Sequence, residues 1–481
     1  MLCSNISAQV RGRAVSLVRC GRISLLAGCR TAVGPLNVSS LRGLASKVQQ
    51  DLVVGGIAYP KDAWTNTPGT ILSKIPKRLH DQADHPIGIL RSQIESHFKG
   101  FTPVSPAAAV VTVKENFDEL GFAPDHPGRS MTDSYYLNKD NMLRTHTSAH
   151  EVATFRAGHD SWLLSADVYR RDEIDSSHYP AFHQMEGARV WEQSDLAVLK
   201  KLNAEMKKQL EACPLLIEDI AMTSGDNPYQ AEHDPEFAAE VAQNLKHSLN
   251  SLIFRLFGQT RPGGAASNEE PLKVRWIEAF FPFTSPSYEV EVWWGGEWLE
   301  ILGCGVVKQQ TLITADVPHK IGWAFGLGLE RIAMILFSIP DIRLFWSEDA
   351  RFTKQFQAGQ ITTFQPYSKY PPCIKDISFW LPETASEEHG AKAAGGGGAV
   401  VQGRKPFHEN DFCEIVRDVA GDLVENVNLI DDFTHKKTGR KSKCYRITYR
   451  SMDRSLSNEE VNKLQSIASG RLVDEMGLEL R

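Results

Sequence analysis

Hydrophobic residues recur at helical spacing in several stretches of the first 340 residues. Between Pro86 and Phe98 they stand three or four positions apart, and the proline opens the segment, where a helix tolerates it. The same period predicts helices over 195–213 and 235–257 and a shorter one over 330–337 that stops near Pro340, with one more short helix near Ile71. The chain therefore contains amphipathic helices that need an apolar surface to cover.

We expect a β-sheet to supply this apolar surface. Residues 273–307 are strand-like, and Tyr288–Trp293 alternates strictly between apolar and polar positions. Residues 102–113, which are β-branched and small, are consistent with another strand. Strands that follow one another with helices between and around them favour an α+β fold, an antiparallel sheet flanked by helices, over a doubly wound parallel sheet.

The last hundred residues show a different order of predicted strands and helices. Strand 373–381, helix 409–424, strands 427–434 and 443–449, helix 458–475 and strand 478–481 form the split βαβ pattern of a ferredoxin-like domain. We expect this domain over 370–481, after a catalytic domain over 86–350 and a linker over 351–369. Residues 384–405, which include the run Gly395–Gly398, are expected to be a flexible insertion.

The first 50 residues differ in composition from the rest. They hold six Arg, one Lys and seven Ser, and the first acidic residue is Asp51. A basic arm for RNA is one explanation, but the absence of acids and the interspersed apolar residues favour a mitochondrial transit peptide over 1–46. Residues 47–85 then form an N-terminal extension, and the mitochondrial matrix is the expected location.

Charge and cysteine usage narrow the function. Seven of the 53 basic residues lie in the first 50 positions, which leaves 46 against 59 acidic ones, so RNA would have to be bound by local basic patches. Of the eight cysteines, the five after residue 50 form no C-x-x-C pair, so neither structural zinc nor a disulfide framework is indicated. No apolar run reaches 18 residues, and no membrane partner is expected.

The segment Gly322–Arg331 carries the first chemical signal. We interpret it as a glycine turn that leads into a helix with Arg331 at its start, an arrangement suited to a nucleotide. It matches neither a dinucleotide fingerprint nor a Walker loop, and an ordinary strand-to-helix connection would look similar. About 160 residues earlier, Asp167–Glu186 forms a second arginine-bearing element that is expected to run strand, polar loop, strand.

Together these two segments resemble motifs 2 and 3 of the class II aminoacyl-tRNA synthetases. His146–Ser148, Phe182–Glu186, Phe281–Thr284 and Trp298–Gly305 narrow the resemblance to the phenylalanyl-tRNA synthetase family, and the C-terminal domain narrows it to the single-chain mitochondrial form. The resemblance covers nearly everything after residue 50. It implies a ferredoxin-fold anticodon-binding domain at the C-terminus and an activity that joins L-phenylalanine to tRNA(Phe) through an adenylate, with ATP as substrate.

The resemblance also implies roles for individual residues. Arg170 and Arg331 are the expected catalytic residues, and the expected ATP-binding set is Arg170, His178, Tyr179, Phe182, Glu300 and Arg331. In this set Phe182 and Arg331 hold the adenine between them. A salt bridge of Arg170 with Asp167 or Asp172 is the structural alternative. The expected phenylalanine-binding set is His146, Ser148, Ala149, His150, Gln184, Met185, Glu186, Phe281, Phe283, Ala324 and Phe325.

Magnesium is expected with ATP, and the candidate ligands are Glu289, Glu291 and Glu300. Ser285 stands where the bacterial catalytic subunit has an acidic residue, which leaves the position of the metal open. The expected tRNA-binding residues are the basic cluster Lys436, Lys437, Arg440, Lys441, Lys443 and Arg446, although a solvated hairpin would also carry such charges.

The resemblance implies a monomer that needs no second subunit. Two other functions stay open at this point. The chain could be a catalytic subunit that needs a partner, which the appended C-terminal domain argues against, or an inactive relative kept as an RNA-binding module, which the presence of Arg170, Glu186 and Arg331 argues against.

Overall fold

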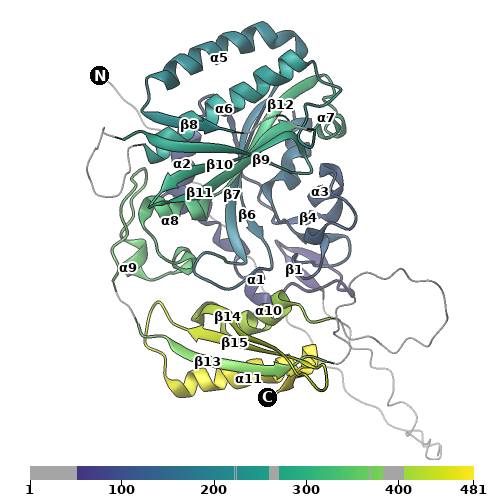
Figure 1. Cartoon of the computed structure of the whole chain (residues 1–481), viewed down its shortest axis with the longest axis vertical. Coiled ribbons are helices and arrows are strands. Elements are labelled where there is room, and N and C mark those ends of the chain that lie inside the picture. The colour runs from purple at the N-terminus through teal and green to yellow at the C-terminus, as the bar shows by residue number, and fades with distance from the viewer. Residues whose placement is uncertain (1–50, 221–222, 224, 259–269, 368–369, 383–405) are drawn as a thin grey trace, which may run out of the picture. The chain divides into compact units, whose positions relative to one another are not determined.

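A computed structural model describes residues 51–220, 223, 225–258, 270–367, 370–382 and 406–481. Its main feature is a sheet of eight strands in the order β3-β6-β7-β12-β11-β10-β9-β8 (Figure 1). The six central strands pair antiparallel, as predicted, whereas β3 and β8 add parallel pairs at the two edges. The strands are β3 (Thr102–Val104), β6 (Ser161–Tyr169), β7 (Ala181–Glu192), β8 (Leu215–Asp219), β9 (Leu272–Ala279), β10 (Thr284–Trp294), β11 (Glu297–Val307) and β12 (Lys320–Gly328).

The predicted strand over 102–113 is two strands in different sheets. The first is β3, and the second is β4, which pairs with β5 in a small separate sheet; β1 and β2 form another. Pro106 and the small residues that follow it interrupt the segment between β3 and β4, because proline cannot donate to a ladder. These short strands are β1 (Leu52–Val54), β2 (Ile57–Tyr59), β4 (Val110–Thr112) and β5 (Asn141–Leu143).

Both faces of the large sheet are covered. On one face, side chains such as Met185 and Trp323 pack in a main core with α2, α6 and α8. On the other face, side chains such as Ala188 and Ala324 pack in a second core with α4 and α7. The predicted helices are present with ends shifted by a few residues. The helices of this region are α1 (Gly69–Leu72), α2 (Pro86–His97), α3 (Val113–Asn116), α4 (Glu151–Arg156), α5 (Leu196–Glu211), α6 (Pro235–Phe257), α7 (Gln309–Thr314), α8 (Leu329–Phe337) and α9 (Ala350–Thr353).

The glycine-rich segment before α8 is a strand, so its interpretation as a turn is wrong. Residues 320–328 form β12 and pair with β7 and β11, and α8 begins directly afterwards at Leu329. A Cβ on Gly322 would lie 2.1 Å from the carbonyl oxygen of Arg189, so this glycine lets two backbones approach. At Gly326 and Gly328 a Cβ would meet no atom within 4 Å, so these two positions leave space beside the strand.

The C-terminal residues form the predicted ferredoxin-like domain. Its sheet has the order β14-β15-β13-β16, and two helices cover one face. Phe379, Phe412 and Tyr445 stack in its core, with the rings of Phe412 and Tyr445 4.5 Å apart. The elements are β13 (Cys373–Trp380), α10 (Glu409–Ala420), β14 (Val424–Thr434), β15 (Lys441–Tyr449), α11 (Asn458–Met476) and β16 (Glu479–Leu480).

The segment proposed as a linker is anchored at three points. Phe352, Phe356 and Phe364 are buried in the main core beside the large sheet, so this part of the chain belongs to the first domain. The proposed transit peptide and the insertion over 384–405 lie outside the described residues. Among the residues that are described, no helix has the length and apolar character needed to cross a membrane.

Gly322→Ala should lower stability because the added methyl group meets the backbone of β7. Overpacking of this kind costs about 1–3 kcal/mol, and a rigid backbone neighbour places the change at the upper end. Thermal unfolding of the purified protein should show a midpoint several degrees below that of the parent chain. Gly328→Ala, in the same strand but with open space at its Cβ position, is the matched control; equal midpoints for the two variants would contradict the close approach at Gly322.

Candidate active site

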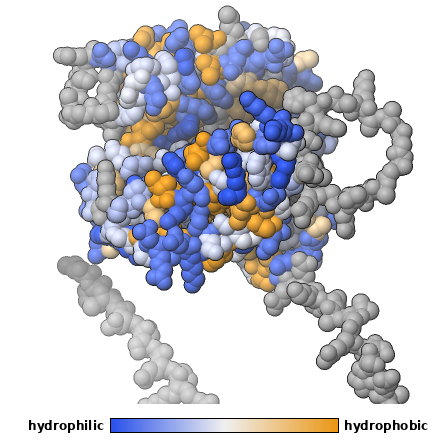
Figure 2. Space-filling model, turned by 60° about the horizontal axis from the view of Figure 1, so that its bottom comes forward, coloured by the Kyte–Doolittle hydropathy of each residue, from blue (hydrophilic) through white to orange (hydrophobic). Residues whose placement is uncertain are grey.

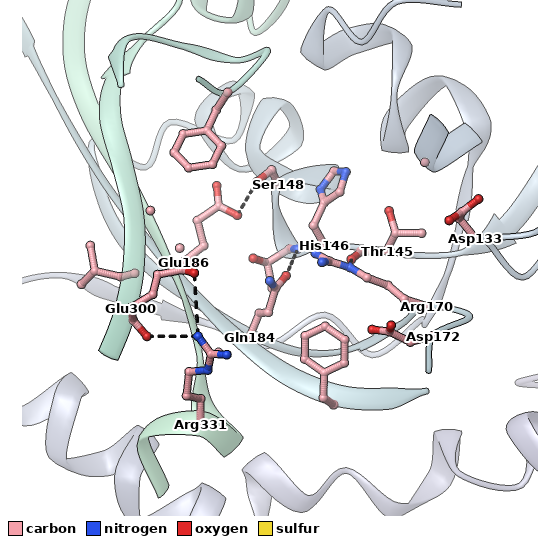
Figure 3. A pocket seen from close by; sticks show the side chains of 18 of the residues that line it. Asp133, Thr145, His146, Ser148, Arg170, Asp172, Gln184, Glu186, Glu300 and Arg331 are labelled. Atoms are coloured by element: carbon pink, nitrogen blue, oxygen red, sulfur yellow. Dashed lines mark hydrogen bonds and ion pairs between the residues drawn. The ribbon is translucent and has the colours of Figure 1, made fainter. Parts of the chain in front are cut away.

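A cavity of about 790 Å³ lies on the face of the sheet opposite the main core. Its floor is formed by β7, β11 and β12, and its walls by the loop after β6, the segment around His146 and the connection between β9 and β10. Figure 3 shows that side chains from these separate segments converge on one space. The pairing of β7 with β12 thus brings the segment Asp167–Glu186 next to the segment Gly322–Arg331.

Arg170, directly after β6, is held by a backbone oxygen and lies over an aromatic ring, and the charge of Asp172 acts on it from nearby. Its Nε donates to the carbonyl oxygen of Thr145 at 2.8 Å, and its guanidinium carbon lies 5.3 Å from the ring centroid of Phe182. Within the described part of the chain it forms no ion pair, because Asp167 is bound instead by Arg144 at 2.7 Å. The proposed salt bridge with Asp167 or Asp172 is therefore not formed, and the remaining guanidinium nitrogens face the cavity (Figure 3).

Arg331 and Glu300 lie next to each other on the wall of the cavity opposite Arg170 (Figure 3). The Nη1 of Arg331 lies 3.4 Å from the carbonyl oxygen of Glu300 and 3.7 Å from its carboxylate. Both side chains are more than half exposed, so this exposed pair contributes little to stability. Arg331 can consequently turn toward a ligand at low cost.

The loop between β6 and β7 carries His178 and Tyr179. Partial burial disfavours the charged imidazole, but the Nδ1 of His178 lies 2.8 Å from Asp175, and this acidic partner raises the pKa of His178. A cationic His178 at the cavity rim suits an anionic ligand. Tyr179 also lines the cavity, but its hydroxyl donates to Asp422 of the C-terminal domain and is not free for a nucleotide.

Acceptors cluster at the other end of the cavity, on β7. Gln184 and Glu186 point the same way because side chains alternate along a strand. The hydroxyl of Ser148 donates to Glu186 at 2.9 Å, and the amide of Thr147 donates to Gln184 at 3.3 Å. Burial raises the pKa of Glu186 to about 7, while its hydrogen bonds from Thr147 and Ser148 oppose that rise. This end of the cavity fits an ammonium group.

His146 lies between the cationic and the acidic ends. Burial and the nearby charge of Arg170 lower its pKa to about 3, so the imidazole is neutral at pH 7. A backbone hydrogen bond with Asn116 opposes this lowering. The ring stacks on Phe122, with centroids 5.5 Å apart and planes 13° apart. A neutral imidazole has one donor and one acceptor nitrogen, so the ring can form a hydrogen bond with a ligand in the cavity.

Two phenylalanines form an apolar slot beside these acceptors. Phe281 and Phe283 stand with centroids 6.1 Å apart and planes 17° apart. Gly303 permits this arrangement, since a Cβ there would lie 2.5 Å from the ring of Phe281. Ala324 and Phe325 also line the cavity, and a larger side chain in place of Ala324 would project into it. The slot matches a flat aromatic side chain.

Three expected phenylalanine-binding residues lie away from the cavity. Met185 is fully buried in the main core, because alternation along β7 directs it to the face opposite Gln184 and Glu186. Ala149 packs in a small core with Phe117 and Tyr136. The ring of His150 lies 3.0 Å from the guanidinium of Arg144 and does not line the cavity.

The three carboxylates proposed for magnesium are not gathered at one point. Glu300 lines the cavity, whereas Glu291 is bound by the Nε of Arg275 at 2.6 Å. Burial and the nearby charges of Glu300 and Glu291 raise the pKa of Glu289. In the described chain, only Glu173, Asp175 and His178 place three potential ligand atoms within 4.8 Å of one another. Glu300 is thus the one proposed ligand that the cavity offers directly to a phosphate-bound ion.

The sequence of this chain is similar to those of known proteins. The model of the class II tRNA synthetase core domain matches residues 72–218 and 242–356. The mitochondrial phenylalanine–tRNA ligase of Saccharomyces cerevisiae is 45% identical over 462 residues, which cover 89% of this chain and 94% of the yeast protein. The chain belongs to the class II phenylalanine–tRNA ligases.

Other members of the family differ in extent. The mitochondrial phenylalanine–tRNA ligase of Mus musculus is 42% identical and covers 92% of this chain and 91% of its own length. The phenylalanine–tRNA ligase alpha subunit of Moorella thermoacetica is 33% identical but covers only 56% of this chain. Residues 368–481 of this chain match the ferredoxin-fold anticodon-binding domain. The ligase described here thus combines in one chain a synthetase core and an anticodon-binding domain.

Several residues that shape the site were not found from the sequence. Phe122 forms one wall with His146, and Thr145, which directly precedes the motif His146–Ser148, anchors Arg170 through its backbone carbonyl oxygen. Asn410 reaches the cavity rim from the C-terminal domain and donates to the carbonyl oxygen of Arg171 at 3.3 Å. No local sequence signal indicates such a contact, because it joins residues 239 positions apart.

The pKa of Glu186 predicts a pH dependence. Below pH 7 the carboxyl is protonated and neutral, and above pH 7 it is ionised and attracts an ammonium group, so kcat/KM for phenylalanine should rise with pH and level off above about 7. Ser148→Ala removes a hydrogen bond that favours the carboxylate, and the rise should move to higher pH. Thr154→Ala, which removes a hydroxyl bonded only to the carbonyl oxygen of His150, should leave the profile unchanged. A Ser148→Ala profile that coincides with the parent profile would rule out this assignment.

Proposed function

We propose that this ligase activates L-phenylalanine with ATP to form phenylalanyl adenylate and then transfers the phenylalanyl group to tRNA(Phe) in the mitochondrial matrix. The observation that carries the proposal is the division of one cavity into a cationic end, an acceptor end and an aromatic slot. These three parts match triphosphate, ammonium and phenyl ring respectively. The names of the mitochondrial relatives support the location.

The first step joins two anions, the carboxylate of the amino acid and the α-phosphate of ATP. Arg170 lines the cavity beside His146, and its Nε is bonded to Thr145 while no bond to its other two guanidinium nitrogens is found among the described residues, so these can hold both groups and balance the charge that develops between them. Gln184, Glu186 and Ser148 fix the ammonium. Catalysis then rests on placement and electrostatics, and no protein nucleophile is needed.

At the nucleotide end, Phe182 and Arg331 are proposed to enclose the adenine ring, with stacking on one face and cation attraction on the other. His178 is proposed to contact the outer phosphates. Magnesium would be held by Glu300 together with the phosphate oxygens and would neutralise part of their charge when bound. A carboxylate and phosphate oxygens are ligands that this cation prefers, so the residue present fits the ion.

The chain is proposed to work as a monomer without a second subunit. Its synthetase core resembles a bacterial alpha subunit, yet it carries its own anticodon-binding domain. An inactive relative kept for RNA binding is disfavoured, since the residues proposed for ammonium, carboxylate and phosphate binding all line one cavity.

The proposed tRNA surface differs from a simple basic patch. Ion pairs already engage three of its residues: Arg440 with Glu479, Lys443 with Asp432 and Arg446 with Asp376. Lys436 and Lys437 are exposed on the turn between β14 and β15, next to Lys441. The proposed phosphate contacts are therefore strongest at this turn.

Aromatic residues on the open face of the β13–β15 sheet extend this surface. Trp380 and Phe433 lie on either side of the small residue Ser442, with their ring centroids 6.4 Å apart. The guanidinium groups of Arg440 and Arg481 stand 5.1 and 5.4 Å from the Trp380 ring. Figure 2, in which the bottom of Figure 1 comes forward, shows hydrophobic and hydrophilic side chains next to each other on the surface that faces the viewer. Exposed rings flanked by cations suit unstacked bases of an anticodon loop.

Exchange of pyrophosphate into ATP tests the first step. The purified ligase should catalyse exchange that depends on phenylalanine, and Arg170→Ala should reduce it by about 10²-fold or more while tRNA binding stays within about twofold. Removal of one stabilising group for transition-state charge commonly costs about 10²–10³ in kcat. A parent protein without phenylalanine-dependent exchange would refute the proposed activity and favour the alternative, an inactive relative that binds RNA.

Charge reversal and truncation in the C-terminal domain test the tRNA surface. Lys437→Glu and Trp380→Ala should each weaken tRNA(Phe) binding, the latter about 5- to 100-fold, since base stacking contributes about 1–3 kcal/mol. Phenylalanine-dependent exchange should remain near the parent level in both. Lys201→Glu on α5 makes the same charge change in the other domain and should leave tRNA affinity unchanged. Equal loss of exchange and of tRNA binding would contradict the proposed division of labour.

A further inference from the structure

A buried bond lies directly behind the proposed adenine clamp. Phe182 and Arg331, the two sides of the clamp, are each next in the chain to a residue that is almost fully buried: His183 is 0% exposed and Glu330 is 3% exposed. The Nδ1 of His183 lies 2.6 Å from one carboxylate oxygen of Glu330, and the backbone amide of His183 donates to the other at 2.8 Å. One carboxylate thus binds both the side chain and the backbone of one residue.

The position of this bond follows from the sheet. β12 ends at Gly328, which pairs with Gln184, and the chain then turns into α8. His183, the next residue of β7, has no partner from β12, and the carboxylate of Glu330 accepts the hydrogen bond that a further strand residue would have accepted. A backbone amide that is buried without a partner loses its hydrogen bond to water and gains none in return, so an acceptor is required at this point.

The surroundings keep the pair in one arrangement. The ring of His183 stacks on Trp346, with centroids 5.7 Å apart, and lies 5.2 Å from the ring of His80. The Nδ1 of His183 and the carboxylate of Glu330 share one hydrogen in the shorter bond. The other ring nitrogen of His183 has no partner among the described residues, so the contact with Glu330 alone fixes the ring by hydrogen bonding.

The clamp itself has no comparable restraint. Arg331 is more than half exposed, and its only polar contacts in the described structure are those with Glu300, at 3.4 and 3.7 Å. The separation of Phe182 and Arg331 is therefore set by their backbones, and the shortest link between these backbones is the contact of His183 with Glu330. We propose that His183 and Glu330 are positioning residues that set the width of the adenine clamp. This inference rests on the proposed function.

Two substitutions at Glu330 test the proposal. Glu330→Met keeps the length of the side chain and removes both bonds, whereas Glu330→Gln keeps an oxygen for the amide of His183. In phenylalanine-dependent pyrophosphate exchange, Glu330→Met should raise KM for ATP at least tenfold and Glu330→Gln about threefold. KM for phenylalanine should change less than twofold in either variant, because Gln184 and Glu186 lie further along β7 where its pairing with β12 is intact.

Adenosine and pyrophosphate separate the clamp from the phosphate contacts. The inhibition constant of adenosine should rise in parallel with KM for ATP, whereas that of pyrophosphate should stay within twofold of the parent value. The matched control is Asn250→Ala, which removes the buried hydrogen bond from Trp276 to Asn250 at 3.0 Å, between α6 and β9. It should lower the unfolding temperature without changing KM for ATP.

The outcomes are distinct. A parent protein without phenylalanine-dependent exchange refutes the proposed function, whereas an active parent leaves the inference to be decided by the variants. Unchanged KM for ATP, equal rises for ATP and phenylalanine, or an equal effect of Asn250→Ala would each overturn it. If Glu330→Met does not fold, Glu330→Gln alone decides through the ratio of the adenosine and pyrophosphate constants, because a general loss of stability would not separate the two.

Discussion

The pairing of β7 with β12 is the contact on which the rest of the site depends. Nine residue pairs, from Lys320 with Glu192 to Gly328 with Gln184, join segments that lie about 140 positions apart in the chain. Small residues make the pairing tight, since a side chain at Gly322 would collide with β7. The register alone brings Gly326 beside Glu186 and places the start of α8 next to Phe182. Both motifs are therefore parts of one surface.

That surface arranges charge in the order the chemistry requires. Arg170 and Arg331 provide cations on opposite walls of the cavity, and Glu186 provides a carboxylate on its floor (Figure 3). His146 lies between them and is kept neutral by burial and by Arg170, so it adds no charge where the carboxylate of the amino acid would lie. Because water is partly excluded, each charge acts more strongly on its ligand than it would in solution.

Sequence patterns predicted the elements well where one period dominates. Both ends of the helix over 235–257 were predicted correctly, because the spacing of its apolar residues and the Asp-Pro pair at its start indicate the same helix. The error at Gly322–Gly328 arose because glycines lower strand propensity, while tertiary pairing on both sides of β12 decides the structure. Met185 was misassigned although alternation along β7 would have directed it to the core. The contact of Tyr179 with Asp422 could not be predicted, since it joins residues 243 positions apart.

The conformation of the ATP-site loop depends on the C-terminal domain as well as on the sheet. Ile174, within that loop, is buried in the core of the ferredoxin-like domain, and Val427 donates its amide to the carbonyl oxygen of Ile174 at 3.0 Å. Arg417 donates to the carbonyl oxygens of Asp172 and Glu173 at 2.7 and 3.2 Å. These bonds hold backbone groups that a free loop would expose to water. In this arrangement the domain expected to bind the anticodon also supports the residues expected to bind ATP. A single chain that carries both domains can form this support without a second subunit.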